Sequence, residues 1–380
     1  MICILQHRDV NYSLVAFLHL HAALRQSREL RSRCKIVFAC SIHGSYELHN
    51  LKAKFGDVYD IDIFECESEY PKKIDAIFSQ YSTDDYQYFI KHDEDVFISS
   101  KSWIDLLEQS EKILDDSVNL LATVNLSTGI PSWYNFSKAF FNAEEQKLLE
   151  SKLSQSSIPN QLWGNDYSSL NKHIALNRIW DEDGYWEKMN ALKYHYRGLH
   201  PVRVQLDLPI NINEIILNRY DAFQQHQPLG GYSDVENRYF CNSFFCMSYQ
   251  RYKEILADKS LYVDAYDEVS INRYAQKNQL KFCFLKDSLG IHVIYNSVYD
   301  QNGYVNGRNL NGDEIEQIFL EGYRKKIIHH LVKNGDILIN SISFYRPSFR
   351  SKIKRYLKRY RLLVKSYRSV KGLLLGRRRW

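Results

Sequence analysis

Three consecutive acids, Asp93, Glu94 and Asp95, interrupt the stretch YFIKHDEDVFIS, which runs from Tyr88 to Ser99. One apolar run leads into them and a second leads away, so the acids are expected at the end of a buried strand. Adjacent carboxylates repel one another, so holding them together requires a positive partner. Two carboxylates two residues apart can hold a divalent cation against a diphosphate, because Mg²⁺ and Mn²⁺ prefer oxygen ligands and accept phosphate among them. The alternative is a solvated turn after an edge strand.

The elements that must position these acids follow a regular alternation over the first 125 residues. Short apolar, β-branched runs predict strands, and apolar residues at steps of three and four predict helices. This alternation is typical of an α/β protein with a mostly parallel sheet and helices on both faces. Ligands bind such sheets beyond the carboxyl ends of the strands, where the acids fall. The predicted strands are 2–6, 35–40, 86–90 and 118–124, and the predicted helices are 12–26, 72–81 and 100–114, the last capped by Ser99 or Ser100.

Residues 126–235 break the alternation and predict an insertion of loops and short helices over the binding edge of the sheet. Four of the six tryptophans lie in this segment. Afterwards the pattern returns. It predicts strands at 237–248 and 280–285, helices at 249–256 and 267–278, and a polar loop followed by a helix within 300–340.

The segment YQYFIKHDEDVFIS resembles the D-x-D strand end of the GT-A superfamily of nucleotide-sugar glycosyltransferases, which have a Rossmann-like α/β sheet. The resemblance covers residues 1–125 and 236–296. It implies that Asp95 binds the metal, that Asp93 contacts the nucleotide or the metal, and that Glu94 is the variable middle position. The implied cofactors are Mn²⁺ or Mg²⁺ and a nucleotide-sugar donor, with a UDP-sugar as the expected donor.

Basic residues before the acids also match this resemblance. Many GT-A enzymes carry a basic residue about 20 positions earlier that reaches the nucleotide or its pyrophosphate, and YPKKIDAIF supplies Lys72 and Lys73. Arg8 is assigned to the same donor-binding group. A lysine on a solvated helix face is the alternative interpretation of either lysine.

The segment YDEVSINRYA, residues 266–275, resembles the acidic pair that begins a helix on the acceptor side of the active site in inverting GT-A enzymes. By that register Glu268 is the catalytic base and Asp267 its neighbour. The usual order is Glu-Asp and this chain has Asp-Glu, so the assignment between the two stays open. The alternative is an ordinary first helical turn, where acids are favoured by the helix dipole.

A late histidine completes the resemblance. His292 lies in GIHVIYNS, where metal-dependent GT-A enzymes often supply a further metal or diphosphate ligand from a loop. The resemblance implies a metal-dependent, inverting glycosyltransferase. By analogy with related glycosyltransferases, the basic tail at residues 341–380 extends this to a glycan or lipid-linked glycan acceptor in bacterial surface-polysaccharide synthesis, such as lipopolysaccharide or capsule. The alternatives are a metal-dependent phosphoryl or nucleotidyl transferase and a non-catalytic membrane-docking protein.

Composition narrows the class of protein. Seven scattered cysteines without a C-x-x-C pair favour reduced thiols and a cytoplasmic location over a disulfide framework or a zinc site. No apolar run approaches the roughly 20 residues of a membrane-spanning helix.

Residues 341–380 hold 14 Lys and Arg and no acid, which leaves residues 1–340 with 36 basic and 45 acidic residues, a net charge of −9. An acidic body without a basic-aromatic groove argues against nucleic acid as a partner.

The basic tail defines the predicted domain organisation, a GT-A-like domain over 1–340 and a membrane-association tail over 341–380. From Phe349 onward, apolar residues recur every three or four positions, which predicts an amphipathic helix with a basic polar face. Such a helix lies in the headgroup region of a membrane with its apolar face buried. The expected location is therefore the inner face of the cell membrane, with the protein bound peripherally. Docking of the tail on the acidic body, a solvated tail and a nucleic-acid contact are the alternatives.

Truncation after Asn340 tests the tail. The full chain should co-sediment with anionic liposomes and not with neutral ones, because each cation near an anionic leaflet contributes ~1 kcal/mol. The truncated chain should stay in the supernatant and keep its activity on a soluble acceptor mimic. Equal binding by both chains, or no preference for anionic lipid, would exclude the membrane role.

Overall fold

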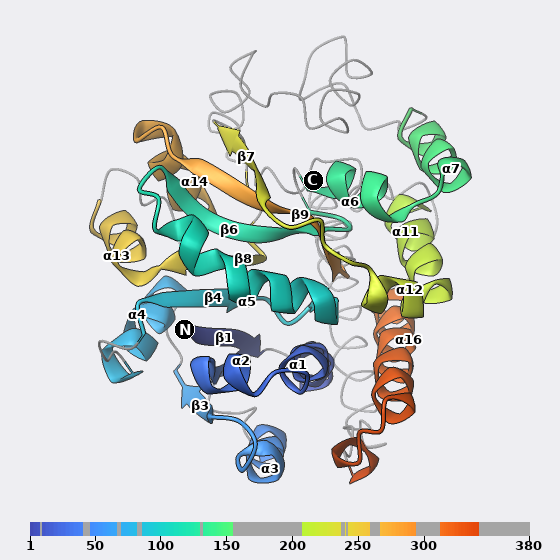
Figure 1. The fold of residues 1–380 in the computed structure, drawn as a ribbon, viewed down its shortest axis with the longest axis horizontal. Helices are drawn as coiled ribbons and strands as arrows, with labels where there is room; N and C mark the ends of the chain where they lie inside the picture. The colour runs from blue at the N-terminus through green and yellow to red at the C-terminus, as the bar shows by residue number, and fades with distance from the viewer. Residues whose placement is uncertain are drawn as a thin grey trace, which may run out of the picture. The chain divides into compact units, whose positions relative to one another are not determined.

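The computed structural model shows an α/β protein (Figure 1). The chain divides into two compact units, Met1–Ile342 and Ser343–Trp380. The second unit lies outside the described residues, so the predicted basic tail and domain boundary stay predictions. The structure describes residues 1–7, 10–40, 46–66, 70–81, 86–129, 132–154, 207–236, 240, 242–258, 267–293 and 312–341.

A single sheet of nine strands organises the first unit. Its order is β3-β2-β1-β4-β8-β6-β9-β5, and β7 also pairs with β9. Six strands, namely β1 to β4, β6 and β9, run in one direction, whereas β5, β7 and β8 run against them. The predicted fold class, α/β with a mostly parallel, Rossmann-like sheet, is confirmed. The strands are β1 Ile2–His7, β2 Lys35–Cys40, β3 Ile61–Glu65, β4 Tyr88–His92, β5 Val96–Ile98, β6 Asn119–Leu126, β7 Tyr232–Glu236, β8 Phe244–Ser248 and β9 Lys281–His292.

Helices cover both faces of the sheet, as the side chains of β4 show. Phe89 contacts Phe78 of α4, with ring centroids 5.4 Å apart, and His92 contacts Trp103 of α5 at 5.4 Å. Residues 89 and 92 point to opposite faces because side chains alternate along a strand. The helices are α1 Val10–Leu24, α2 Arg28–Arg33, α3 Tyr46–Phe55, α4 Tyr70–Tyr81, α5 Ser100–Leu114, α6 Trp133–Phe140, α7 Ala143–Ser154, α11 Asp207–Asn218, α12 Tyr220–Gln225, α13 Tyr249–Ala257, α14 Asp267–Lys277 and α16 Gly312–Lys333, followed by a 3₁₀ turn at Leu338–Ser341.

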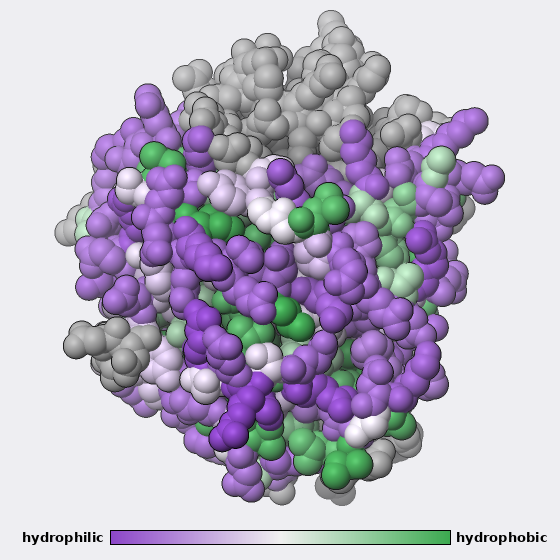
Figure 2. All heavy atoms as spheres, in the orientation of Figure 1, coloured by the Kyte–Doolittle hydropathy of each residue, from purple (hydrophilic) through white to green (hydrophobic). Residues whose placement is uncertain are grey.

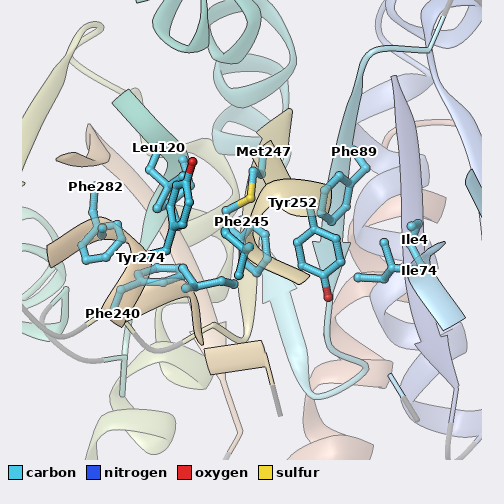
Figure 3. Packing of buried hydrophobic residues seen from close by; sticks show 14 of the residues in the cluster. Ile4, Ile74, Phe89, Leu120, Phe240, Phe245, Met247, Tyr252, Tyr274 and Phe282 are labelled. Atoms are coloured by element: carbon cyan, nitrogen blue, oxygen red, sulfur yellow. The ribbon is translucent and has the colours of Figure 1, made fainter. Parts of the chain in front are cut away.

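The core between the sheet and the helices α4, α13 and α14 is an aromatic-rich cluster (Figure 3). Phe89 contacts Phe245 of the adjacent strand, with ring centroids 5.9 Å apart, and Tyr252 of α13, with ring centroids 5.2 Å apart. Burial of such large rings dominates the stabilisation of a core. On the surface, the face shown in Figure 2 is mostly hydrophilic, with apolar residues in small separate groups.

Helix α5, which follows β5, shows how the sequence determines where a helix forms and where it begins. Apolar residues of α5 lie on one buried face, and the Ser99 side chain accepts a hydrogen bond from the Ser102 amide at 3.3 Å. A serine at this position satisfies one of the unpaired amides of the first turn. The predicted helix 100–114 and the Ser99 cap are confirmed.

Two predicted strands differ from the structure in length. The strand predicted over 237–248 is shorter, because β8 begins at Phe244 and residues 242–243 form a turn. The strand predicted over 280–285 is longer, because β9 continues through an irregularity to His292. Asp287 has φ 57° there, and its neighbour Lys286 is exposed, so polar residues interrupt the strand pattern without ending the strand.

The segment predicted as an insertion is only partly separate from the sheet. Its described parts form α6, α7, α11 and α12, but its last residues form β7, which pairs with β9. Residues 155–206, which contain Trp163, Trp180 and Trp186, lie outside the described residues. No helix among the described residues is both long enough and apolar enough to cross a membrane.

Gly290 allows β9 to approach β5 and β6 closely. A Cβ atom at this position would lie 2.5 Å from Cδ1 of Ile98 and 2.8 Å from Cδ2 of Leu126. We therefore expect Gly290→Ala to lower the free energy of unfolding by about 1–3 kcal/mol, the usual cost of overpacking a core. Urea unfolding measures this change, and Lys286→Ala, at an exposed position of the same strand, is the control. Equal stability of the two variants would contradict the close approach.

Candidate active site

The acidic turn, residues 93–95, connects β4 to β5 at the carboxyl end of β4. Its backbone is held on both sides by neighbouring strands. The Asp93 amide donates to the Ser243 carbonyl at 2.9 Å, and the Val293 amide donates to the Asp95 carbonyl at 2.9 Å. The turn is therefore fixed by the ends of β8 and β9, and its side chains lie where α/β sheets bind ligands.

Asp95 lies against His292. In the pairing of β5 with β9, Val96 is opposite His292, and this register brings the Nε2 atom of His292 to 3.6 Å from Oδ2 of Asp95. The histidine side chain is buried at 5% exposure, whereas 33% of the Asp95 side chain is exposed. The structure thus brings together two residues that the sequence analysis assigned to one metal site. His292, however, ends a strand and does not lie in the expected loop.

The backbone of His292 is held by the residues that follow β6. Its amide donates to Oγ of Ser127 at 3.2 Å, and its carbonyl accepts a hydrogen bond from Oγ1 of Thr128 at 2.8 Å. Both hydroxyl residues are fully buried. These contacts fix the imidazole on the side of the sheet edge that carries Asp95.

Asp93 has a different set of partners. The Nζ atom of Lys91 lies 3.1 Å from its Oδ1, and Nε2 of Gln6 donates a hydrogen bond to the same oxygen. Lys91 also donates to the carbonyl of Asn242 at 2.6 Å. The positive group beside Asp93 is therefore a buried lysine of the same strand, which the sequence analysis did not single out.

Two relations explain these partners, one along the strand and one between strands. Lys91 precedes Asp93 by two residues, so both side chains lie on one side of the strand. In the pairing of β1 with β4, Leu5 is opposite His92, which places Gln6 beside Asp93. The second relation depends on the strand register and cannot be obtained from local sequence.

His92 also lies next to the acids, but it is part of the core. Its ring is packed against Trp103 and Phe244, and Nε2 lies 2.7 Å from the carbonyl of Val96. Burial lowers its pKa to about 4, so the ring is neutral near pH 7. His92 therefore stabilises the base of the turn and supplies no charge to the site.

Asp95 and His292 fit the metal that the resemblance implies. A carboxylate is a ligand that Mg²⁺ and Mn²⁺ prefer, and the adjacent imidazole provides a second donor. Within the described ranges, no group of three or more His, Cys, Asp or Glu side chains is arranged to hold a metal ion. Ions of this kind usually keep several waters and bind substrate phosphates, so two protein ligands are compatible with their chemistry.

The two lysines of α4 are in different environments. Lys72 is exposed and Lys73 is half-buried. Burial raises the pKa of the Cys40 thiol to about 11; the Glu65 carboxylate adds to this rise, and the Lys73 ammonium opposes it. Cys40 and Glu65 are the last residues of β2 and β3, so the Lys73 ammonium acts electrostatically on the carboxyl end of β2.

Three assigned residues have side chains that lie outside the described residues. The backbone of α14 begins at Asp267, as predicted, but the side chains of Asp267 and Glu268 lie outside the described residues, as does Arg8. The helix itself is held firmly, because the Asn272 side chain accepts a hydrogen bond from the Phe240 amide at 2.7 Å and donates one to its carbonyl at 2.9 Å.

No protein-family model matches the chain. No curated protein matches it. Among solved structures, residues 1–349 of S. aureus TarS are similar over 88% of this chain and 73% of that chain, with 8% sequence identity and a TM-score of 0.36. At this TM-score the likeness carries no argument about function.

Proposed function

We propose that this protein is a metal-dependent glycosyltransferase that uses a nucleotide-sugar donor. The observation that carries the proposal is the contact between Asp95 and His292, which are far apart in the sequence and meet where β5 pairs with β9. The proposal is supported by the α/β sheet, by the position of the acidic turn at a carboxyl strand end, and by the resemblance of that turn to the GT-A D-x-D motif.

In this proposal Asp95 and His292 hold Mn²⁺ or Mg²⁺. The bound ion would act as a Lewis acid that neutralises charge on a diphosphate leaving group. Asp93, with Lys91 behind it, accepts hydrogen bonds from the nucleoside part of the donor. Lys73 is the basic residue assigned to the phosphates, because its ammonium group acts on Cys40 at the carboxyl end of β2.

The acceptor hydroxyl requires a base within hydrogen-bond reach. We assign this role to Glu268, with Asp267 as the alternative, at the start of α14. A single displacement by the deprotonated acceptor inverts the anomeric centre. The proposed donor is a UDP-sugar, and the proposed acceptor is a glycan or lipid-linked glycan of bacterial surface polysaccharide. The tail is proposed to dock at the inner face of the membrane. These parts of the proposal are supported by the resemblance and by the tail sequence alone.

Donor hydrolysis and transfer by three variants test the function. A panel of UDP-sugars with and without Mn²⁺ should reveal metal-dependent hydrolysis by the wild-type protein. Asp95→Ala should abolish it together with Mn²⁺-dependent nucleotide binding. Glu268→Gln should lower turnover by ~10²–10⁴-fold, the usual contribution of a general base, with donor affinity nearly unchanged.

Glu111→Gln is the matched control, because Glu111 is a partly exposed acid that pairs with Arg33 at 2.6 Å. It should retain wild-type activity. Near-normal turnover of Asp95→Ala would refute the metal site, and loss of activity in Asp267→Asn alone would move the base to Asp267. Hydrolysis of nucleoside triphosphates without any activity on nucleotide sugars would identify a phosphoryl or nucleotidyl transferase.

A further inference from the structure

Lys91 is a lysine in the middle of the sheet. Its strand, β4, lies between β1 and β8, and only 3% of the residue is exposed. Lysine is almost never buried to this extent unless it is paired, because desolvating an ammonium group is costly. Its presence at this position therefore requires specific partners.

The partners are arranged around the ammonium group on the side of the acidic turn. Nζ lies 3.1 Å from Oδ1 of Asp93 and 2.6 Å from the Asn242 carbonyl, and 6.0 Å from the centroid of the Phe245 ring. The aliphatic part of the side chain shares its face of β4 with Phe89, which belongs to the aromatic core. Lys91 thus connects the hydrophobic core to one carboxylate of the site.

A purely structural role does not account for this arrangement. An apolar residue at position 91 would pack beside Phe89 and Phe245 without any desolvation cost, and replacing buried ion pairs by apolar residues is often neutral or stabilising. The pair that Lys91 forms is also not closed off from the surface, because 25% of the Asp93 side chain is exposed. The ammonium group therefore orients a carboxylate that can still meet a ligand.

We propose that Lys91 is a positioning residue that fixes the Asp93 carboxylate as the hydrogen-bond acceptor for the hydroxyl groups of the donor nucleoside. The inference rests on the proposed function. The inference gives the two outer acids of the turn different roles. Asp93 is held by Lys91 and Gln6, whereas Asp95 lies beside His292. Loss of Lys91 should then weaken nucleotide binding and leave the binding of the metal alone almost unchanged.

The test uses the full-length protein and the variants Lys91→Met, Lys91→Arg and Lys277→Met. Lys277→Met is the matched control, because Lys277 pairs with Asp258 at 2.8 Å on the exposed surface of α14. Mn²⁺ alone is titrated by electron paramagnetic resonance, and UDP in the presence of saturating Mn²⁺ is titrated by calorimetry. If Lys91→Met does not fold, Lys91→Gln, which keeps a hydrogen-bond donor, is compared in its place.

Lys91→Met should weaken UDP binding by about tenfold or more, in line with the loss of a hydrogen bond to a charged group. Its Mn²⁺ affinity should stay within about twofold of wild type, because the proposed metal ligands remain. Lys91→Arg should recover part of the UDP affinity, and Lys277→Met should match wild type in both titrations.

The outcomes separate this inference from the proposed function. If the wild-type protein binds neither Mn²⁺ nor UDP, the proposed function fails. If the wild type binds both and Lys91→Met binds UDP as well as Lys277→Met does, the positioning role is refuted. Equal weakening of Mn²⁺ and UDP binding would also refute it, because it would show a general structural effect on the turn.

Discussion

Charge compensation at the end of a buried strand governs the whole candidate site. Three carboxylates in sequence repel one another, and the apolar strands around them restrict access of water that would screen the repulsion. The ammonium group of Lys91 lies beside Asp93, and the imidazole of His292 lies beside Asp95, so each outer acid has its own partner. The acids can therefore be held together in a turn whose backbone is bonded to two neighbouring strands.

This compensation depends on the sheet topology. Lys91 comes from β4, the strand that leads into the acids. His292 comes from the far end of β9, which reaches the turn because the strand continues beyond its irregularity at Asp287. Gly290 makes this second half of β9 possible, since a side chain there would collide with Ile98 and Leu126. The position of the His292 imidazole thus depends on how β9 packs against β5 and β6 at Gly290, outside the acidic turn.

Features of this arrangement that depend on neighbouring residues in the sequence could be predicted. Contacts between residues far apart in the sequence could be predicted only for some pairs. The helix at 100–114 and its Ser99 cap follow from side-chain periodicity and the preference of serine for caps, and both are confirmed. The meeting of Asp95 and His292 was anticipated only through a resemblance in motif order. Lys91 and Gln6 were missed, because their proximity to Asp93 depends on strand geometry and on the register between β1 and β4. The roles of all the assigned site residues stay predictions, and for Asp267, Glu268 and Arg8 the side chains also lie outside the described residues.

Asp95 and His292 are proposed to bind one divalent cation together. Electron spin-echo envelope modulation of the protein with bound Mn²⁺ tests this directly, because a directly coordinated imidazole nitrogen modulates the echo. The account predicts a nitrogen modulation in the wild-type protein that is lost in His292→Ala and kept in His330→Ala, a histidine of α16 that lies near Asp221. An echo without nitrogen modulation in the wild type, or one that persists in His292→Ala, would contradict the account.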